Sequence, residues 1–176
     1  KILISGDGGD ELFGGYTFRY KKFLSLTTET SSPLDKVIAY LQCHERDRVP
    51  DQEKIFNHKS NFSWKSIYKL LLPHFDNELT RLDQVFLADY NGKLLYNFNP
   101  INLGIIKNFD MELLTPILND ELLFLAPHIK KSYVYDQNND LGKLPLRSIL
   151  KQNGHDLLVG KQKLGFNVNT INLWKK

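Results

Sequence analysis

The sequence predicts a mostly helical α/β fold. A short apolar run, Ile2 to Ile4, ends in a glycine-rich turn, which is typical of a strand buried on both faces. Later apolar residues recur with a helical period, and we expect one early strand and about five or six helices. Apolar residues make up 41% of the 176. This fraction is enough to form a core and excludes a mostly disordered chain.

The first strand should lead directly into a helix. Its glycines are followed by Glu11-Leu12-Phe13, where we expect a helix with acidic residues in its first turn. Gly14-Gly15 then offers a kink before an aromatic and basic stretch, Tyr16 to Phe23. Alternating aromatic and basic residues can bind single-stranded nucleic acid, but we interpret this stretch as an amphipathic segment packed in the core. Residues 26–33 are rich in serine and threonine and should form a loop.

The rest of the chain alternates between helical patterns and breaks. Apolar residues fall on one helical face in five segments: 34–41, 64–71, 79–86, 118–125 and 146–150. The breaks are a polar, exposed connection at 45–58, a turn at Asn91-Gly92, irregular structure over 97–108 and a polar turn at 137–140. A basic, glycine-containing tail covers 160–176.

Composition excludes several classes of protein and site. The net charge of +3 is too small to indicate nucleic-acid binding, and no apolar run is long enough to cross a bilayer. Cys43 is the only cysteine, which excludes an internal disulfide and a thiolate zinc site and fits a reducing compartment, so we expect a cytoplasmic location. The five histidines lack metal-ligand spacing. Because the sequence opens on a strand pattern without a methionine, we expect a C-terminal piece of a longer protein.

The run Ser5 to Glu11 is the strongest candidate site. A strand, glycines and a helix start make a loop whose backbone N–H groups can converge on an anion. Its three carboxylates suit a phosphate site if Mg²⁺ is present, because Mg²⁺ binds one or two carboxylates together with phosphate oxygens. A tight turn, in which glycines supply positive φ and acids cap the helix, explains the same residues. Local chemistry leaves both interpretations open.

A second candidate lies near the end of the chain, at Gly160 to Phe166. Two lysines stand there beside a glycine and an aromatic residue. A lysine in a polar cleft can neutralise charge that develops on a phosphate or an oxyanion. By itself this segment reads as an ordinary basic loop.

Three segments together resemble one known family. The run Leu3 to Tyr16 closely resembles the signature loop of the glutamine-hydrolysing asparagine synthetase family. Glu112 to Asn119 is similar to that family's Glu-x-Arg-x-Pro-Phe-Leu-Asp segment, and Lys163-Leu164-Gly165-Phe166 with Trp174 to its Lys-Gln-Gly-Phe…Trp ending. The order and spacing also match, so the resemblance extends over nearly the whole chain.

The resemblance implies a fold and an activity. The fold would be the C-terminal part of an adenine nucleotide α-hydrolase-like domain of the ATP pyrophosphatase type. In such a family ATP, with Mg²⁺ as cofactor, adenylates the side-chain carboxylate of aspartate, and pyrophosphate leaves. Ammonia from glutamine then displaces AMP to give asparagine. Residues 1–176 would be the C-terminal portion of a single synthetase domain, with the pyrophosphate loop and an N-terminal glutaminase domain upstream in the same polypeptide.

The resemblance also implies partners and residue roles. The partners would be the small-molecule substrates ATP, aspartate and ammonia. No nucleic-acid or membrane partner is expected, and a homodimer is one open alternative. Asp10 matches the loop aspartate that helps bind Mg²⁺ and pyrophosphate, and Asp7 the loop acid near the reacting aspartate and ammonia. Lys163 matches the lysine that stabilises charge on the phosphates and the intermediate. The nucleotide pocket would be lined by Ser5, Gly6, Gly8 and Gly9.

Departures from the family pattern keep rival functions open. Residues 101–108 keep none of the family's Lys-Val-Asp-Arg-x-Ser-Met-Ala side chains in register, Leu114 replaces an arginine, and Asn119 replaces an aspartate. These changes affect recognition of aspartate more than ATP chemistry. A ligase with another carboxylate acceptor and a non-catalytic paralogue are therefore alternatives. Because half of the nucleotide site would lie upstream, we expect this chain alone to be inactive.

Overall fold

The computed structural model describes residues 1–44 and 62–159, in two compact units, Lys1–Pro145 and Leu146–Lys176. Helices dominate the described residues, which confirms the mostly helical α/β class. The predicted connection at 45–58 and the tail at 160–176 lie outside the described residues. No helix in the described ranges combines the length and the apolar character needed to cross a bilayer.

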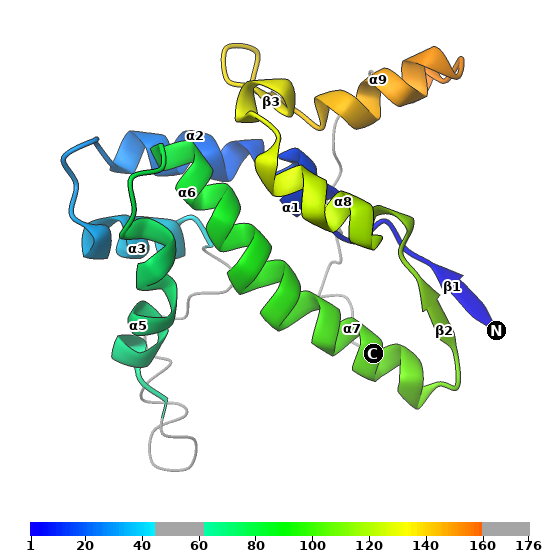
Figure 1. Cartoon of the computed structure of the whole chain (residues 1–176), viewed down its shortest axis with the longest axis horizontal. Coiled ribbons are helices and arrows are strands. Elements are labelled where there is room, and N and C mark those ends of the chain that lie inside the picture. Colours follow the sequence, from blue (N-terminus) through cyan, green and yellow to red (C-terminus); the bar gives the residue numbers. More distant parts are fainter. Residues whose placement is uncertain (45–61, 160–176) are drawn as a thin grey trace, which may run out of the picture. The chain divides into compact units, whose positions relative to one another are not determined.

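In the first unit a long series of helices lies between two short strands, β1 and β2 (Figure 1). Most of the predicted helices are present, with ends shifted by a few residues. The elements up to the second strand are β1 (Ile2–Ile4), α1 (Gly9–Phe13), α2 (Thr17–Leu26), α3 (Pro33–Gln42), α5 (Trp64–Phe75), α6 (Arg81–Ala88), the π-helix η1 (Asp89–Phe98), α7 (Asn99–Asn108) and β2 (Glu112–Leu114).

Shorter elements complete the described chain. The first unit continues through short helical turns and a hairpin, and α9 begins at the boundary between the units. These elements are the 3₁₀ turn η2 (Pro116–Leu118), α8 (Asp120–Leu125), the 3₁₀ turns η3 (Ala126–His128) and η4 (Lys131–Tyr133), β3 (Tyr135–Asp136), β4 (Leu141–Gly142), α9 (Leu144–Gln152) and α10 (Asp156–Val159).

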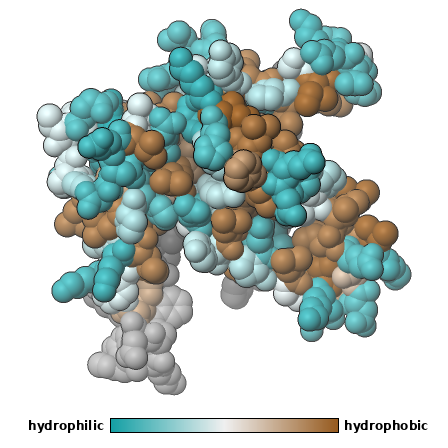
Figure 2. Space-filling view, in the orientation of Figure 1, coloured by the Kyte–Doolittle hydropathy of each residue, from teal (hydrophilic) through white to brown (hydrophobic). Residues whose placement is uncertain are grey.

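Strand β1 pairs with β2 in parallel, with Leu3 opposite Leu113. The prediction that β1 is buried on both faces is wrong for this structure, because Ile2, Leu3 and Ile4 are 65%, 41% and 68% exposed. Within the described residues β2 is its only strand partner, and helix α7 lies against β2. Figure 2 shows hydrophobic residues gathered over β1, β2 and α7. The pair thus presents apolar surface of the kind that parallel sheets normally bury.

Helix α6 continues through η1 into α7 as one helical run (Figure 1). The predictions of a turn at Asn91-Gly92 and of irregular structure over 97–108 are therefore wrong. Burial explains the first error, because Val85 and Leu94 are almost fully buried on either side of the turn signal and hold the backbone helical. Pro100 lies inside this run, at the junction of η1 and α7, and contributes no N–H to the backbone hydrogen bonds there.

The core of the first unit is largely aromatic. Tyr20 stacks on Phe86 with ring centroids 4.8 Å apart, and Phe23 packs against Phe75 at 5.8 Å. Tyr16, before α2, and Tyr20 and Phe23 within it are buried, which confirms core packing for these residues. Phe18 is 58% exposed and does not pack in the core. The stretch therefore offers no row of exposed rings for stacking bases.

The β3–β4 hairpin is pressed against the end of α1. The N–H of Lys143 donates to the Phe13 carbonyl oxygen at 2.8 Å, next to the left-handed residue Gly14, which ends α1. A Cβ on Gly142 would lie 1.8 Å from the Gly14 carbonyl oxygen. Only glycine at position 142 allows the two backbones to approach this closely, and this approach brings Lys143 to α1.

We expect Gly142→Ala to destabilise the protein by about 2 kcal/mol or more, because the clash is with backbone that has no freedom to turn away. Gly104→Ala is the matched control: a Cβ there meets nothing within 4 Å, and the position is helical. That change should be neutral or should stabilise by up to about 1 kcal/mol. Denaturant unfolding of both variants measures the difference. Equal stabilities would contradict the close approach.

Candidate functional site

The acidic loop follows β1 directly and leads into α1, as the sequence predicts. The N–H of Ser5 donates to the Leu114 carbonyl oxygen at 2.9 Å, so the β1–β2 ladder continues into the loop. Gly8 has φ of +87°, and its backbone carbonyl accepts the N–H of Leu12 at 2.9 Å. A Cβ on Gly8 would collide with Leu118, whereas one on Gly6 would meet nothing within 4 Å. Gly8 is therefore needed for the turn, and Gly6 leaves one side of the loop open.

Asp7 forms one hydrogen bond within the loop and one with α7. Its N–H donates to the Ser5 hydroxyl oxygen at 3.3 Å, and the side-chain amide of Asn102 donates to Asp7 Oδ2 at 2.8 Å. Helix α7 lies against β2, the strand that also holds Ser5. Asp7 is half-buried. The segment that departs most from the family pattern thus supplies a partner to the loop.

Asp10 forms an ion pair that the sequence did not predict. Lys143 Nζ lies 2.8 Å from Asp10 Oδ1, and the two side chains are 33% and 23% exposed. Gly15 packs directly over the pair, because a Cβ there would lie 1.7 Å from Asp10 Oδ1 and 2.6 Å from Lys143 Cε. Lys143 itself has φ of +60°, which is unusual for a non-glycine residue. The hairpin and Gly15 together hold a lysine beside the loop.

The next residues of the signature run are structural. Glu11 is buried and accepts a hydrogen bond from the Tyr16 hydroxyl at 2.5 Å. Burial, together with the Glu11 charge, raises the pKa of Tyr16 far above its usual value, so its hydroxyl stays protonated and donates. The Arg19 guanidinium lies 3.8 Å over the Tyr16 ring, and Lys93 Nζ lies 4.1 Å over it. These contacts fix α1 to α2 and η1.

A buried polar cluster joins α2, the end of α3 and η1. Asp89 Oδ1 accepts from the Tyr40 hydroxyl at 2.8 Å and lies 3.6 Å from Arg19. His44 places Nδ1 2.8 Å from the Tyr40 carbonyl oxygen and Nε2 2.9 Å from Arg19. Because a carbonyl only accepts, Nδ1 must carry the proton, and Nε2 accepts from arginine. The hydrogen bonds therefore assign a neutral His44.

The buried carboxyl group should make stability depend on pH. Burial raises the pKa of Asp89 to about 6 from 3.8, although Arg19 opposes the shift. The folded protein therefore binds the proton more tightly than the unfolded chain. The resulting stabilisation is present below about pH 4 and is lost as pH rises through about 6, by about 2–3 kcal/mol. Denaturant unfolding between pH 4 and 7 should show this fall in wild type but not in Asp89→Asn. If the unfolding free energies of wild type and Asp89→Asn changed with pH in parallel, the raised pKa of Asp89 would be contradicted.

The residues of the loop fit a magnesium ion that is held mainly by a substrate's phosphates. No group of three or more metal-ligating side chains occurs in the described ranges, so an all-protein metal cage is not offered there. Mg²⁺ in phosphate-transfer sites needs only one or two carboxylates, the phosphates supplying the rest. Asp10 is partly exposed and stands next to a lysine, and both charges suit a metal–polyphosphate ligand.

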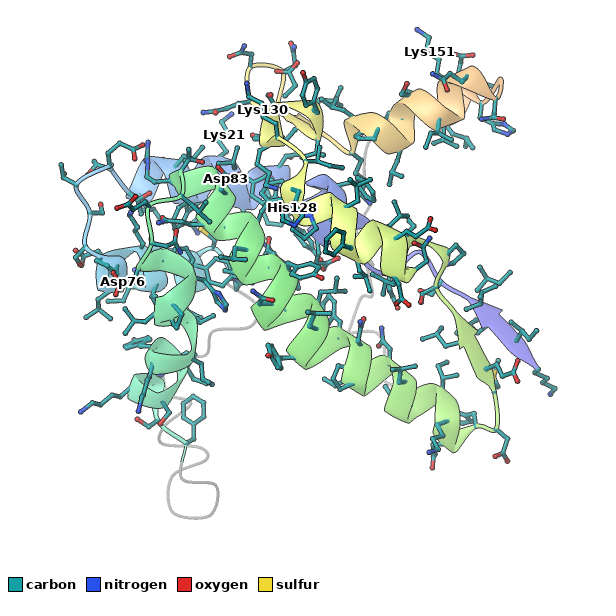
Figure 3. All side chains as sticks on the ribbon, in the orientation of Figure 1. Lys21, Asp76, Asp83, His128, Lys130 and Lys151 are labelled. Atoms are coloured by element: carbon teal, nitrogen blue, oxygen red, sulfur yellow. The ribbon has the colours of Figure 1, made fainter. Side chains whose placement is uncertain are left out.

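Of the described histidines, His128 and His155 are exposed, whereas Cys43 is packed in the interior. His128 lies beside α8 (Figure 3), with its ring 5.6 Å from that of Phe124. Cys43 is buried at the end of α3, and its thiol donates to the Ala39 carbonyl oxygen at 3.1 Å. A buried free cysteine of this kind packs as a small apolar side chain.

The structure brings together most of the predicted site residues. Ser5, Gly6, Asp7, Gly8, Gly9 and Asp10 lie in the loop and the first turn of α1. Lys163 lies outside the described residues, so a cleft shared by Asp10 and Lys163 stays a prediction. Sequence reasoning missed Lys143 and Asn102. The glycine before Lys143 is the one sequence signal that could have pointed to it, and no sequence pattern pointed to Asn102.

These features define a mostly helical α/β protein with an acidic, glycine-rich loop at the carboxyl end of a parallel strand pair. The chain belongs to the asparagine synthase family, because the sequence model of that family, described as Asparagine synthase, matches residues 1–176. No curated protein and no solved structure matches it significantly. The family is one of ligase-type enzymes, and the match agrees with the resemblance of the signature loop.

Proposed function

We propose that the chain is the C-terminal part of an ATP-dependent, amide-forming ligase that converts aspartate to asparagine. ATP adenylates the side-chain carboxylate, pyrophosphate leaves, and ammonia derived from glutamine displaces AMP. The observation that carries this proposal is the pairing of Asp10 with Lys143 at the mouth of the glycine-rich loop. A carboxylate and an ammonium group side by side suit a magnesium–polyphosphate ligand.

Each loop residue has a role in this proposal. Ser5, Gly6, Gly8 and Gly9 line the nucleotide pocket through backbone groups, and the open side of Gly6 leaves room for a ligand. Asp10 holds the metal-bound pyrophosphate, Lys163 stabilises charge on the phosphates and the intermediate, and Asp7 faces the reacting groups. A bound Mg²⁺ would supply charge neutralisation on the phosphates. Adenylation needs such positioning more than a protein nucleophile.

The same proposal includes a larger domain. The exposed apolar side chains of β1 are of the kind that a parallel sheet covers with further strands and helices. We therefore propose that residues 1–176 complete a synthetase domain whose pyrophosphate loop and glutaminase domain belong to the same cytoplasmic polypeptide. An adenine nucleotide α-hydrolase-like fold fits this arrangement.

A second candidate is a ligase of the same type with another carboxylate acceptor. Leu114 stands where the family has arginine, and its side chain is exposed on β2 next to the loop. It offers no charge to a second carboxylate of the acceptor. Asn119 carries less weight, because its side chain accepts the N–H of Leu122 at 2.8 Å and caps α8, a role that aspartate and asparagine fill equally.

Pyrophosphate release tests the proposal. The complete polypeptide that carries this sequence is assayed with ATP, Mg²⁺, glutamine or ammonium, and a panel of carboxylates that includes aspartate. Release that depends on aspartate, with asparagine as product, supports the first candidate. Release with another acid only supports the second. The absence of release with every acid, together with the absence of Mg-ATP binding, would identify a non-catalytic paralogue.

A further inference from the structure

Asp7 and Asp10, the two partly exposed carboxylates of the acidic loop, have partners of different charge. Asp10 pairs with the ammonium group of Lys143 at 2.8 Å. Asp7 Oδ2 instead accepts from the neutral amide of Asn102, also at 2.8 Å. Within residues 1–44 and 62–159, no lysine, arginine or histidine nitrogen forms an ion pair with Asp7. Among these residues, the charge of Asp10 is compensated and that of Asp7 is not.

Asn102 is held by a rigid element. It lies in the middle of α7, the helix that continues η1 and packs on β2. The N–H of Asp7 is bound by Ser5, whose own N–H belongs to the β1–β2 ladder. Both ends of the Asp7–Asn102 hydrogen bond therefore rest on secondary structure. An amide in this position fixes the direction of the carboxylate without removing its charge.

From this contrast we propose that Asn102 is a positioning residue: it orients Asp7, whose charge no described cation compensates, toward the nitrogen nucleophile, which is ammonia or a primary amine. The inference rests on the proposed amide-forming function, in which Asp7 already faces the reacting groups, and it adds Asn102 as the residue that orients Asp7. The two neighbouring carboxylates then have different roles. Asp10 and Lys143 bind the polyphosphate, and Asp7, oriented by Asn102, binds the amine. The Asp7 carboxylate would repel a polyphosphate, and Lys143 would repel an ammonium ion.

The chemistry of the second half-reaction fits this division. The nitrogen lone pair forms the C–N bond, and the bond between the acyl carbon and the phosphate oxygen breaks, so that AMP leaves with its electron pair. One proton must leave the nitrogen, and the Asp7 carboxylate can accept it. A carboxylate held by one N–H donor keeps acceptor capacity for an amine, since two oxygens offer several lone pairs.

Substitutions at Asn102 separate this role from a structural tether. Asn102→Lys keeps a hydrogen-bond donor but adds a positive charge. Asn102→Gln keeps a neutral donor, and Asn102→Leu removes the donor without adding charge. Asn108→Lys, at an exposed position on the same helix, is the matched control. The complete polypeptide is assayed with ammonium chloride as the amine for product formation, and by ATP–pyrophosphate exchange for adenylation alone.

We expect Asn102→Lys to raise the KM for ammonium about tenfold or more, equivalent to about 1.4 kcal/mol, with exchange changed less than about twofold. Asn102→Gln should restore much of the affinity, and Asn108→Lys should behave as wild type. A tether alone would tolerate lysine, so an unchanged KM for ammonium in Asn102→Lys overturns the role of Asn102 while wild-type exchange still supports the proposed function. Without exchange or pyrophosphate release in wild type, both proposals fail.

Discussion

Asp10→Asn should reduce pyrophosphate release by about a thousandfold or more, equivalent to about 4 kcal/mol of transition-state stabilisation. Asparagine has nearly the shape of aspartate but no charge, so it can neither attract a magnesium–polyphosphate ligand nor pair with Lys143 across 2.8 Å. Both losses affect the same ligand. The rate of pyrophosphate release by the complete polypeptide at saturating ATP measures the effect.

The fold should survive this change. Both side chains of the ion pair are partly exposed, so its loss should cost no more than about 1 kcal/mol of unfolding free energy. Asp120→Asn is a suitable control, because Asp120 also stands in the first turn of a helix, α8, and is exposed. Its activity should equal that of wild type. Wild-type activity in Asp10→Asn would remove Asp10 from the proposed metal site.

The order strand, glycine turn and helix could be predicted because its signals are local. A short apolar run, glycine at the positive-φ position 8 and acidic residues after it each act on their own neighbours. The same holds for α3, where Ser32 accepts the N–H of Asp35 and Pro33 begins the helix. Local chemistry decides these boundaries, so sequence reasoning finds them.

Tertiary packing overrode other local signals. Asn91-Gly92 is a turn signal, yet it lies within a helical run because Leu94 is fully buried in the core. A Cβ on Gly92 would lie 3.4 Å from Leu71 of α5, which shows how closely that helix approaches. The burial of β1 was mispredicted for the opposite reason: its apolar side chains are present, but no described layer covers them.

The partners of the site could not be predicted, since they come from remote segments. Asn102 is 95 residues from Asp7 along the chain, and its segment departs from the family pattern. Lys143 reaches Asp10 only because Gly142 lets the hairpin lie against the end of α1. Neither contact leaves a periodic or motif-like trace. Such contacts depend on the arrangement of helices and strands rather than on any single one of them.

Lys143→Met should lower pyrophosphate release by a few hundredfold, within the range observed when one charge-stabilising donor is removed from an active site. Methionine keeps an unbranched stem beside Gly15, and the N–H that binds the Phe13 carbonyl is unaffected. Only the ammonium group is lost, and with it the partner of Asp10. Lys130→Met, at an exposed position before η4, should leave activity unchanged. Steady-state pyrophosphate release compares the two variants.

Gly15→Ala tests whether Lys143 and Asp10 act as a pair. A Cβ at position 15 would overlap Asp10 Oδ1 and crowd Lys143 Cε, so the two charges must separate although both remain. Because the crowded atoms end flexible side chains, the protein should still fold, and activity should fall nearly as far as in Lys143→Met. An active Gly15→Ala beside an inactive Lys143→Met would mean that Lys143 binds the polyphosphate by itself. Two active variants would show that the ion pair is structural, and the proposed phosphate site would then have to lie elsewhere.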